Sequence, residues 1–110
     1  MKPVDLEYIR RYIAALPEVA RPHQDRMKGR DGAIKLVVGE AGTFVLTLRD
    51  GLLAVAEGDG PADVTISMPP EDFVKLTNGT LNVLSAAAFG RIKFQGDMGL
   101  LMGLRAAFER

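Results

Sequence analysis

The side chains that could do chemistry are few in this chain and stand apart from one another. His23 is the only histidine, and it lies in a polar stretch next to a proline. A lone histidine without companions is far more often a surface residue than a metal ligand or a general base. Ser85 has no histidine or aspartate near it at the spacing of a nucleophile motif. We therefore expect no catalytic residue.

Acidic and glycine-rich segments resemble ion or cofactor sites only superficially. Glu71 and Asp72 are neighbours that point apart on a helix, and the positive end of the helix dipole explains both. Segment 58–63 (GDGPAD) has too few acidic residues, wrongly spaced, for a calcium loop. Segment 96–99 (GDMG) lacks the phosphate-binding pattern of a P-loop or Rossmann turn. The sequence predicts neither a metal site nor a cofactor.

Composition narrows the class of protein further. A length of 110 residues predicts one domain over residues 1–110. The chain has no cysteine, which excludes a disulfide framework, a thiol nucleophile and a cysteine-based metal site. Its 14 basic and 14 acidic residues give no one-sided basic surface, so we expect no nucleic-acid partner. Apolar runs are too short to span a membrane and the charged start is unlike a signal peptide, so a cytoplasmic location is expected.

The first half predicts a helix followed by three strands. Apolar residues recur at helical spacing over residues 5–16, and Pro17 is expected to end that helix. The sequence from Pro17 to Asp31 is polar and ambiguous in secondary structure, with one helical turn expected at 24–28. Alternating strands then follow, joined by short turns as an antiparallel meander, and Asp50–Gly51 is the strongest hairpin signal. The predicted strands are 33–38, 43–49 and 52–57.

The second half predicts two further strands and three helices. Residues 82–89 are apolar almost all round, so we expect that helix to be covered on more than one side. A strand follows with Ile92 and Phe94 facing inward, and Asp97 is expected to cap the last helix. The predicted elements are a strand at 63–68, helices at 71–77 and 82–89, a strand at 91–95 and a helix at 97–108. This half has much hydrophobic surface and almost nothing reactive, which favours enclosing an apolar ligand over chemistry.

The segment from Ala62 to Phe108 resembles the sterol carrier protein-2 family of small lipid-carrying domains. The similar text is ADVTISM, EDFVKLTNGTLN and SAAAFGRIKFQGDMGLLMGL, with the turns Asn78–Gly79 and 96–99 where the family has them. Over residues 33–57 the resemblance is one of topology only. Val83–Leu84 and Phe89 depart from the family's usual residues and would make a pocket wall more apolar.

The resemblance implies an α+β fold, in which a five-stranded, mostly antiparallel sheet and helices on one of its faces enclose an apolar tunnel. The last helix would cover one mouth. The implied function is a non-enzymatic carrier of a fatty acyl, acyl-CoA or sterol-like ligand, acting as a monomer or weak homodimer with at most transient membrane contact. The tunnel residues expected are Phe73, Leu76, Leu84, Ala88, Phe89, Phe94, Met98, Leu101, Met102 and Phe108.

Two alternatives remain open. The same apolar stripes are typical of an ordinary core, and the apolar surface would equally suit a protein–protein interaction or dimerisation module. Arg91 and Lys93, together with the more distant Arg105 and Arg110, would either attract an anionic headgroup or form a solvated strand face.

Overall fold

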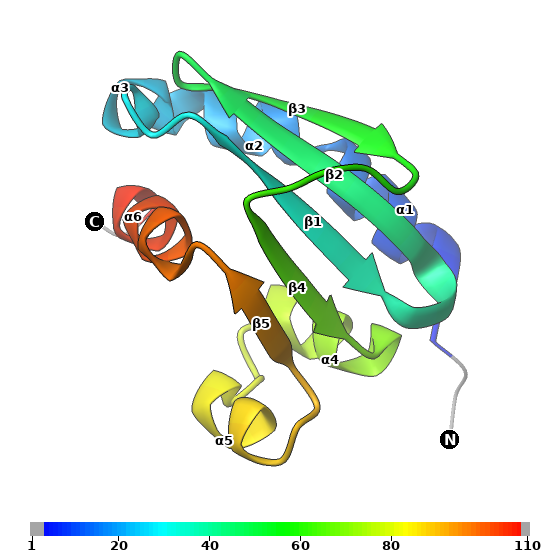
Figure 1. The fold of residues 1–110 in the computed structure, drawn as a ribbon. Coiled ribbons are helices and arrows are strands. Elements are labelled where there is room, and N and C mark those ends of the chain that lie inside the picture. Colours follow the sequence, from blue (N-terminus) through cyan, green and yellow to red (C-terminus); the bar gives the residue numbers. More distant parts are fainter. Residues whose placement is uncertain (1–3, 109–110) are drawn as a thin grey trace.

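The computed structural model describes residues 4–108, with side chains described for residues 4–103. Five strands form one sheet in the order β3-β2-β1-β4-β5 (Figure 1). Neighbouring strands are antiparallel except β1 and β4, which run parallel. The strands are β1 (Gly32–Val38), β2 (Gly42–Arg49), β3 (Leu52–Glu57), β4 (Val64–Met68) and β5 (Lys93–Gly96). The predicted five-stranded, mostly antiparallel sheet is confirmed, with the parallel pair as an addition.

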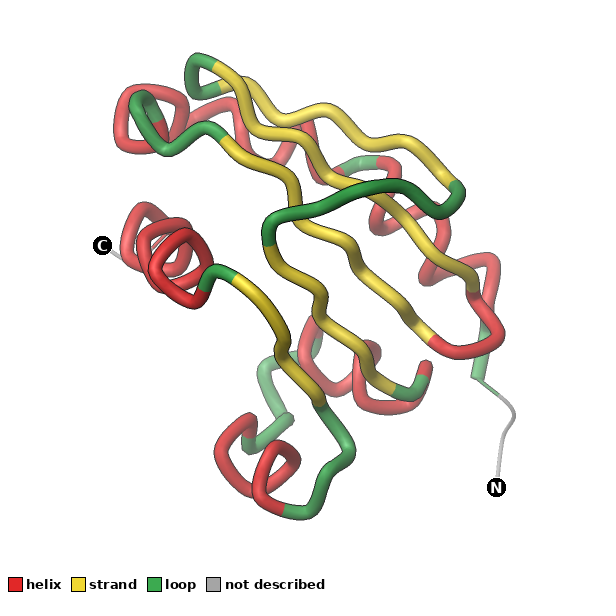
Figure 2. Tube along the Cα trace, in the orientation of Figure 1, coloured by secondary structure: helices red, strands yellow, loops and turns green. Residues whose placement is uncertain are grey.

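The parallel pair follows from the path of the chain after β3. Segment 58–63 crosses the open face of the sheet before the chain enters β4 on the other side of β1 (Figure 2). The Lys35 ammonium holds the crossing segment through Asp59, with Nζ and Oδ1 2.6 Å apart. Gly60 lies against Val45, whose side chain is on the same face of the sheet.

Helices cover the opposite face of the sheet. The helical elements are α1 (Leu6–Ala14), α2 (Leu16–Ala20), η1 (Arg21–His23), α3 (Gln24–Met27), η2 (Gly39–Ala41), α4 (Pro70–Thr77), α5 (Val83–Ala88) and α6 (Met98–Phe108). In Figure 1, α1 and α2 lie behind β1–β3, α4 lies behind β4, and α5 projects beyond β5. Helix α6 leaves the end of β5 and packs against α3 and β4.

The core forms where α1 meets the alternating strands. Ile9 and Ile13 of α1 are fully buried against Leu36, Val38 and Phe44 of the sheet. Alternation forces this arrangement, because every second side chain of a strand points to the same face. The alternation predicted for the first two strands is confirmed.

The β2–β3 hairpin is built as the sequence predicts. Asp50 and Gly51 have φ values of 55° and 82°, so both central residues are left-handed, as a two-residue type I′ turn requires. Aspartate tolerates this backbone better than most residues, and glycine adopts it freely.

Residues 16–27 are more helical than the sequence predicts. Helix α1 does end near Pro17, but that proline lies in the first turn of α2, and η1 and the expected turn α3 follow. A proline in the first turn of a helix loses no hydrogen bond, because the first backbone N–H groups have no partner within the helix. Pro17 therefore marks a change of direction from α1 into α2, and the stretch whose structure the sequence leaves ambiguous is largely helical.

Helix α5 is not covered as predicted. Leu84 and Phe89 are largely exposed, and only Ala86 of the helix is buried. The following strand also begins later than predicted, at Lys93. The backbone N–H groups of Arg91 and Ile92 both donate to the Ala86 carbonyl, at 2.8 and 3.3 Å, so they close α5 instead of joining the sheet.

Candidate functional site

The helix-side face of the sheet is covered unevenly. Under α1, Leu36 and Val38 are buried at 7% and 0% exposure. Ile34, Ile66 and Phe94 point to the same face and pack against the core, but each stays half-buried. Register places Ile66 opposite both Leu36 and Phe94. We call Ile34, Ile66 and Phe94 the inner strip, an apolar surface beneath the helix layer that the protein itself does not fully cover.

Helix α6 is fixed at its start beside this strip. The Leu100 N–H donates to Asp97 Oδ1 at 3.0 Å, the expected cap, and the Asp97 N–H donates to the Asp63 carbonyl at 2.8 Å. The Leu100 side chain packs against a second apolar cluster made by Ala20, Met27 and Leu48. The first turn of α6 is therefore anchored to both the sheet and the α2–α3 region.

The predicted tunnel residues separate into three groups. Phe73 belongs to the core at 4% exposure, with its ring edge-on to Tyr12 at a centroid distance of 5.7 Å. The other predicted residues of α4 and α5, and the residue that ends α5, are exposed: Leu76, Leu84, Ala88 and Phe89. In β5 and α6, Phe94 and Leu101 are half-buried, and Met98 and Met102 are exposed. Phe94 belongs to the inner strip, and the other three residues lie on α6, which follows β5 in the chain. The side chain of Phe108 lies outside those described. Of the predicted residues, Phe94 and those of α6 thus lie on consecutive elements, whereas the others are in the core or exposed.

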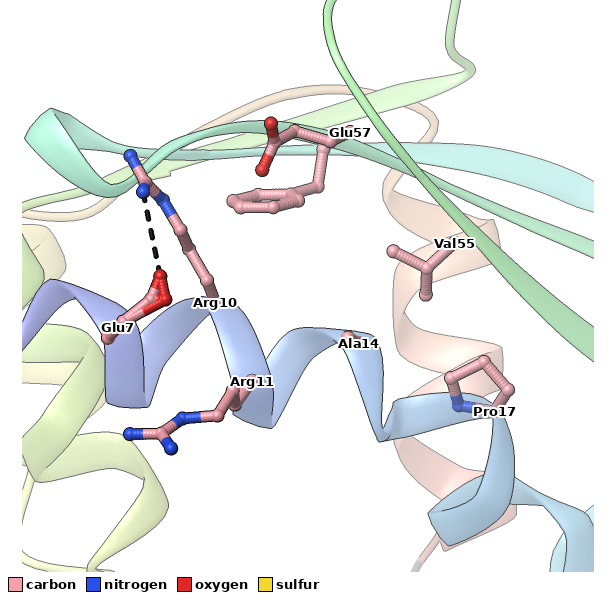
Figure 3. A pocket seen from close by; sticks show the side chains of 8 residues that line it. Glu7, Arg10, Arg11, Ala14, Pro17, Val55 and Glu57 are labelled. Atoms are coloured by element: carbon pink, nitrogen blue, oxygen red, sulfur yellow. Dashed lines mark ion pairs between the residues drawn. The ribbon is translucent and has the colours of Figure 1, made fainter.

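The larger hollow lies elsewhere, between α1 and the β2–β3 hairpin (Figure 3). This groove has a volume of about 490 Å³ and is open to solvent. Its lining comprises Glu7, Arg10, Arg11, Ala14, Pro17, Phe44, Val55 and Glu57. We call it the α1–β3 groove. None of its residues belongs to the predicted set, because the groove forms between α1 and strands far from it in the sequence, which leaves no local signal.

The α1–β3 groove has an apolar floor and a rim of mixed charge. Phe44 forms the floor at 3% exposure, and Val55 and Pro17 are half-buried. On the rim, Arg10 Nη1 lies 3.8 Å from Glu7 Oε1, and Arg10 Nε donates to the Ala41 carbonyl at 3.0 Å. Positive and negative groups therefore compensate one another there, and the rim does not select a single sign of ligand charge.

A smaller hollow of about 190 Å³ lies beside α5. It is lined by the polar residues Lys75, Thr80, Asn82, Ser85 and Arg91 and by the apolar residues Leu81, Ala86 and Phe89. It is too small for an acyl chain, since ligand pockets are typically about 300–1,000 Å³.

Arg91 has a structural partner that sequence analysis missed. Its Nε donates to Asp72 Oδ2 at 3.0 Å and its Nη2 donates to the other carboxylate oxygen, while Asp72 is fully buried. Helix-start electrostatics therefore do not fully explain Asp72, and Arg91 precedes β5 and is paired with Asp72 instead of lying on a solvated strand face. Local spacing could not reveal the pair, because the two residues are 19 positions apart.

Family comparison agrees with this architecture. Residues 13–109 match the family model described as the SCP-2 sterol transfer family. The chain belongs to the SCP-2 sterol transfer family. Its sequence relatives include hydroxysteroid dehydrogenase-like protein 2 of Xenopus tropicalis, 33% identical over 86 residues, which are 74% of this chain and 21% of that protein. The chain thus spans about a fifth of that relative's length.

Solved SCP-2 structures share the fold. The sterol carrier protein domain 2 of Helicoverpa armigera superimposes with a TM-score of 0.63 at 30% identity, covering 94% of this chain and 87% of that one. The palmitated SCP2L2 of Aedes aegypti superimposes with a TM-score of 0.65 at 25% identity, over 94% and 95% of the two chains. The expected fold family is therefore confirmed, while the side chains of residues 4–103 do not by themselves outline an enclosed tunnel.

Two further properties bear on what the SCP-2 domain can do. Within residues 4–108, no helix is both long and apolar enough to cross a bilayer. The same part of the chain holds no cluster of three or more histidine, cysteine, aspartate or glutamate residues arranged to bind a metal ion. What the site offers is apolar surface between a sheet and its helices.

Proposed function

We propose that this SCP-2 domain is a non-enzymatic lipid carrier that holds an apolar ligand against the inner strip. The observation that carries the proposal is the half-buried state of Ile34, Ile66 and Phe94 beneath a helix layer. Apolar side chains on the core-facing side of a sheet are normally covered by the protein itself. A bound acyl chain would complete this coverage and remove the remaining apolar area from water.

Burial alone supplies enough free energy for such a ligand. Each buried methylene contributes roughly 0.8 kcal/mol, so a sixteen-carbon chain gains about ten kcal/mol before ordering costs. Such binding needs no cofactor and no charged anchor, and it discriminates poorly among apolar ligands. The proposal therefore covers fatty acyl, acyl-CoA and sterol-like ligands as one class.

Within this proposal, α6 forms the movable wall. Leu101 is half-buried and Met98 and Met102 are exposed, so the helix has apolar side chains available for a ligand. Methionine suits such a wall because its flexible thioether adapts to differently shaped ligands. Leu76, Leu84, Ala88, Phe89 and Phe108 are proposed to contact the ligand only if α5 and α6 close over it. We also propose a cytoplasmic location and a monomeric or weakly dimeric state.

Native mass spectrometry of the purified protein tests the carrier function. We expect a folded species with additional lipid mass, which disappears after organic extraction. The extracted protein should then take up a fluorescent fatty acid. A protein that is empty as purified and also takes up no fluorescent fatty acid would rule the carrier function out.

A further inference from the structure

Helix α5 and the residue that follows it carry the most exposed large apolar side chains among residues 4–103. Leu84 and Phe89 are 85% and 84% exposed, against 55% for Met102 and 54% for Leu52. A six-residue helix and its C-cap residue that together leave two such side chains in water are not explained by the packing of the core. Exposed apolar surface of this kind marks a contact with a partner, a ligand or a membrane.

The two largest exposed side chains, Leu84 and Phe89, share one arc of the helix, whereas Val83, 38% exposed, lies outside that arc. At 100° per residue, Leu84, Ser85, Ala88 and Phe89 fall within an arc of roughly 140°. All four are exposed, whereas Ala86 lies outside the arc and is 5% exposed. We call Leu84, Ala88 and Phe89 the α5 arc. In Figure 1 this helix projects from the body of the protein, apart from α1–α3 and from α6.

The sequence segment that contains the α5 arc carries charges of one sign, between Asp72 and Asp97. Residues 73–96 contain Lys75, Arg91 and Lys93 and no acidic residue, although the whole chain is neutral. The Arg91 charge is compensated by buried Asp72. Lys75 and Lys93 are exposed, and neither forms an ion pair with any residue of the described part of the chain. Lys75 also lines the small hollow that Phe89 borders, so a cation and an apolar ring are neighbours.

We propose that the α5 arc docks on a membrane surface that carries anionic lipid headgroups. Leu84 and Phe89 would enter the boundary between headgroups and acyl chains, and Lys75 and Lys93 would face the phosphates. Short apolar projections flanked by cations bind such surfaces through apolar burial and electrostatic attraction together. The proposal goes beyond lipid carriage, because it concerns the open arrangement seen in the structure, in which the α5 arc faces solvent and is free to meet a membrane.

A membrane fits this surface better than a protein partner does. A specific protein interface buries about 800 Å² on each side. Helix α5 is about 9 Å long at 1.5 Å per residue and presents two large side chains, which is far less surface. A bilayer needs no such area, because its headgroup layer adapts to whatever projects into it.

Vesicle co-sedimentation of the full chain tests the proposal. We expect the protein to bind vesicles of phosphatidylcholine mixed with phosphatidylglycerol, and to bind phosphatidylcholine vesicles at least tenfold more weakly. The double variant Leu84→Ser and Phe89→Ser should lose at least tenfold in affinity for the mixed vesicles. The double variant Lys75→Gln and Lys93→Gln should lose about tenfold, and added salt should weaken the wild type similarly.

Leu52→Ser is the matched control, because Leu52 is exposed but lies on β3, away from the α5 arc. It should bind the mixed vesicles like the wild type. Equal binding by the Leu84/Phe89 variant and the wild type would overturn the proposal, and so would equal binding to neutral and anionic vesicles. A concentration-dependent dimer in light scattering that the Leu84/Phe89 variant abolishes, without vesicle binding, would also overturn it. Native mass spectrometry of the same samples shows whether each variant still carries lipid mass. A failure of membrane docking is thereby distinguished from a failure of lipid carriage.

Discussion

The Arg91 guanidinium is paired with the fully buried carboxylate of Asp72, which joins the start of α4 to the segment entering β5. The Nε–Oδ2 hydrogen bond is 3.0 Å long and the second bond comes from Nη2. Arg91 itself remains 47% exposed. Between the two residues the chain builds most of α4 and all of α5, so this pair fixes both ends of the projecting segment.

This geometry predicts an asymmetric response to mutation. Arg91→Ala leaves a buried carboxylate without its counter-charge, which should lower the free energy of unfolding by about 3–5 kcal/mol. Asp72→Ala leaves a partly exposed guanidinium that water can solvate, so it should cost less. Urea unfolding of both variants measures the difference. Equal losses, or a larger loss for Asp72→Ala, would show that the pair does not stabilise the fold in this way.

Gly96 should be far less tolerant of a side chain than Gly79. Both have a positive φ, 108° and 74°. A Cβ at Gly96 would lie 2.3 Å from the Asp63 carbonyl oxygen, whereas a Cβ at Gly79 would meet nothing within 4 Å. Gly79→Ala should cost about 1–2 kcal/mol for its left-handed backbone. Gly96→Ala should cost at least about 3 kcal/mol and disturb the start of α6, as thermal unfolding and amide exchange would show.

Filling the space beside the inner strip should reduce lipid uptake. Leu101→Trp enlarges a half-buried side chain of α6 and is expected to lower fluorescent fatty acid uptake several-fold with unchanged circular dichroism. Met102→Trp should act in the same direction.

Ala14→Trp is the control for these tryptophan variants, because Ala14 lines the α1–β3 groove and not the inner strip. It should leave fatty acid uptake unchanged. The opposite result, a loss with Ala14→Trp and none with Leu101→Trp, would move the ligand from the inner strip into the α1–β3 groove.

Asp59 should contribute to stability only above acidic pH. The hydrogen bond from Lys35, the Gly60 backbone N–H and the Lys35 charge hold the pKa of Asp59 below its usual value. Because the folded pKa is lower than the unfolded one, this contribution is present above about pH 4 and is lost as the pH falls through the folded pKa. Asp59 is fully solvated, so salt should weaken the effect.

Titration of the Asp59 carboxyl group followed by NMR checks that Lys35 lowers its pKa. In Lys35→Gln the pKa of Asp59 should rise toward its usual value, and in Lys75→Gln it should stay where it is in the wild type. An unchanged pKa in Lys35→Gln would show that the ion pair to the crossing segment does not persist in solution.

Sequence alone determined the helices and strands and, for most of them, which side chains point toward the core. Alternation in β1 and β2, the left-handed pair Asp50–Gly51 and the cap at Asp97 are local features, set by side-chain period and backbone sterics within a few residues. The family resemblance over residues 62–108 added the order of the strands and helices. These parts agree with the structure because each depends on neighbours in the chain.

Tertiary structure alone decided which apolar residues are covered. Phe73 and Leu84 look alike in a helical pattern, but Tyr12 of α1 packs against Phe73 while Leu84 stays in water. The Asp72–Arg91 pair, the α1–β3 groove and the half-buried Ile66 likewise arise from contacts between distant segments. Periodicity states that a side chain needs cover, but whether another part of the chain supplies that cover depends on how the elements pack in space.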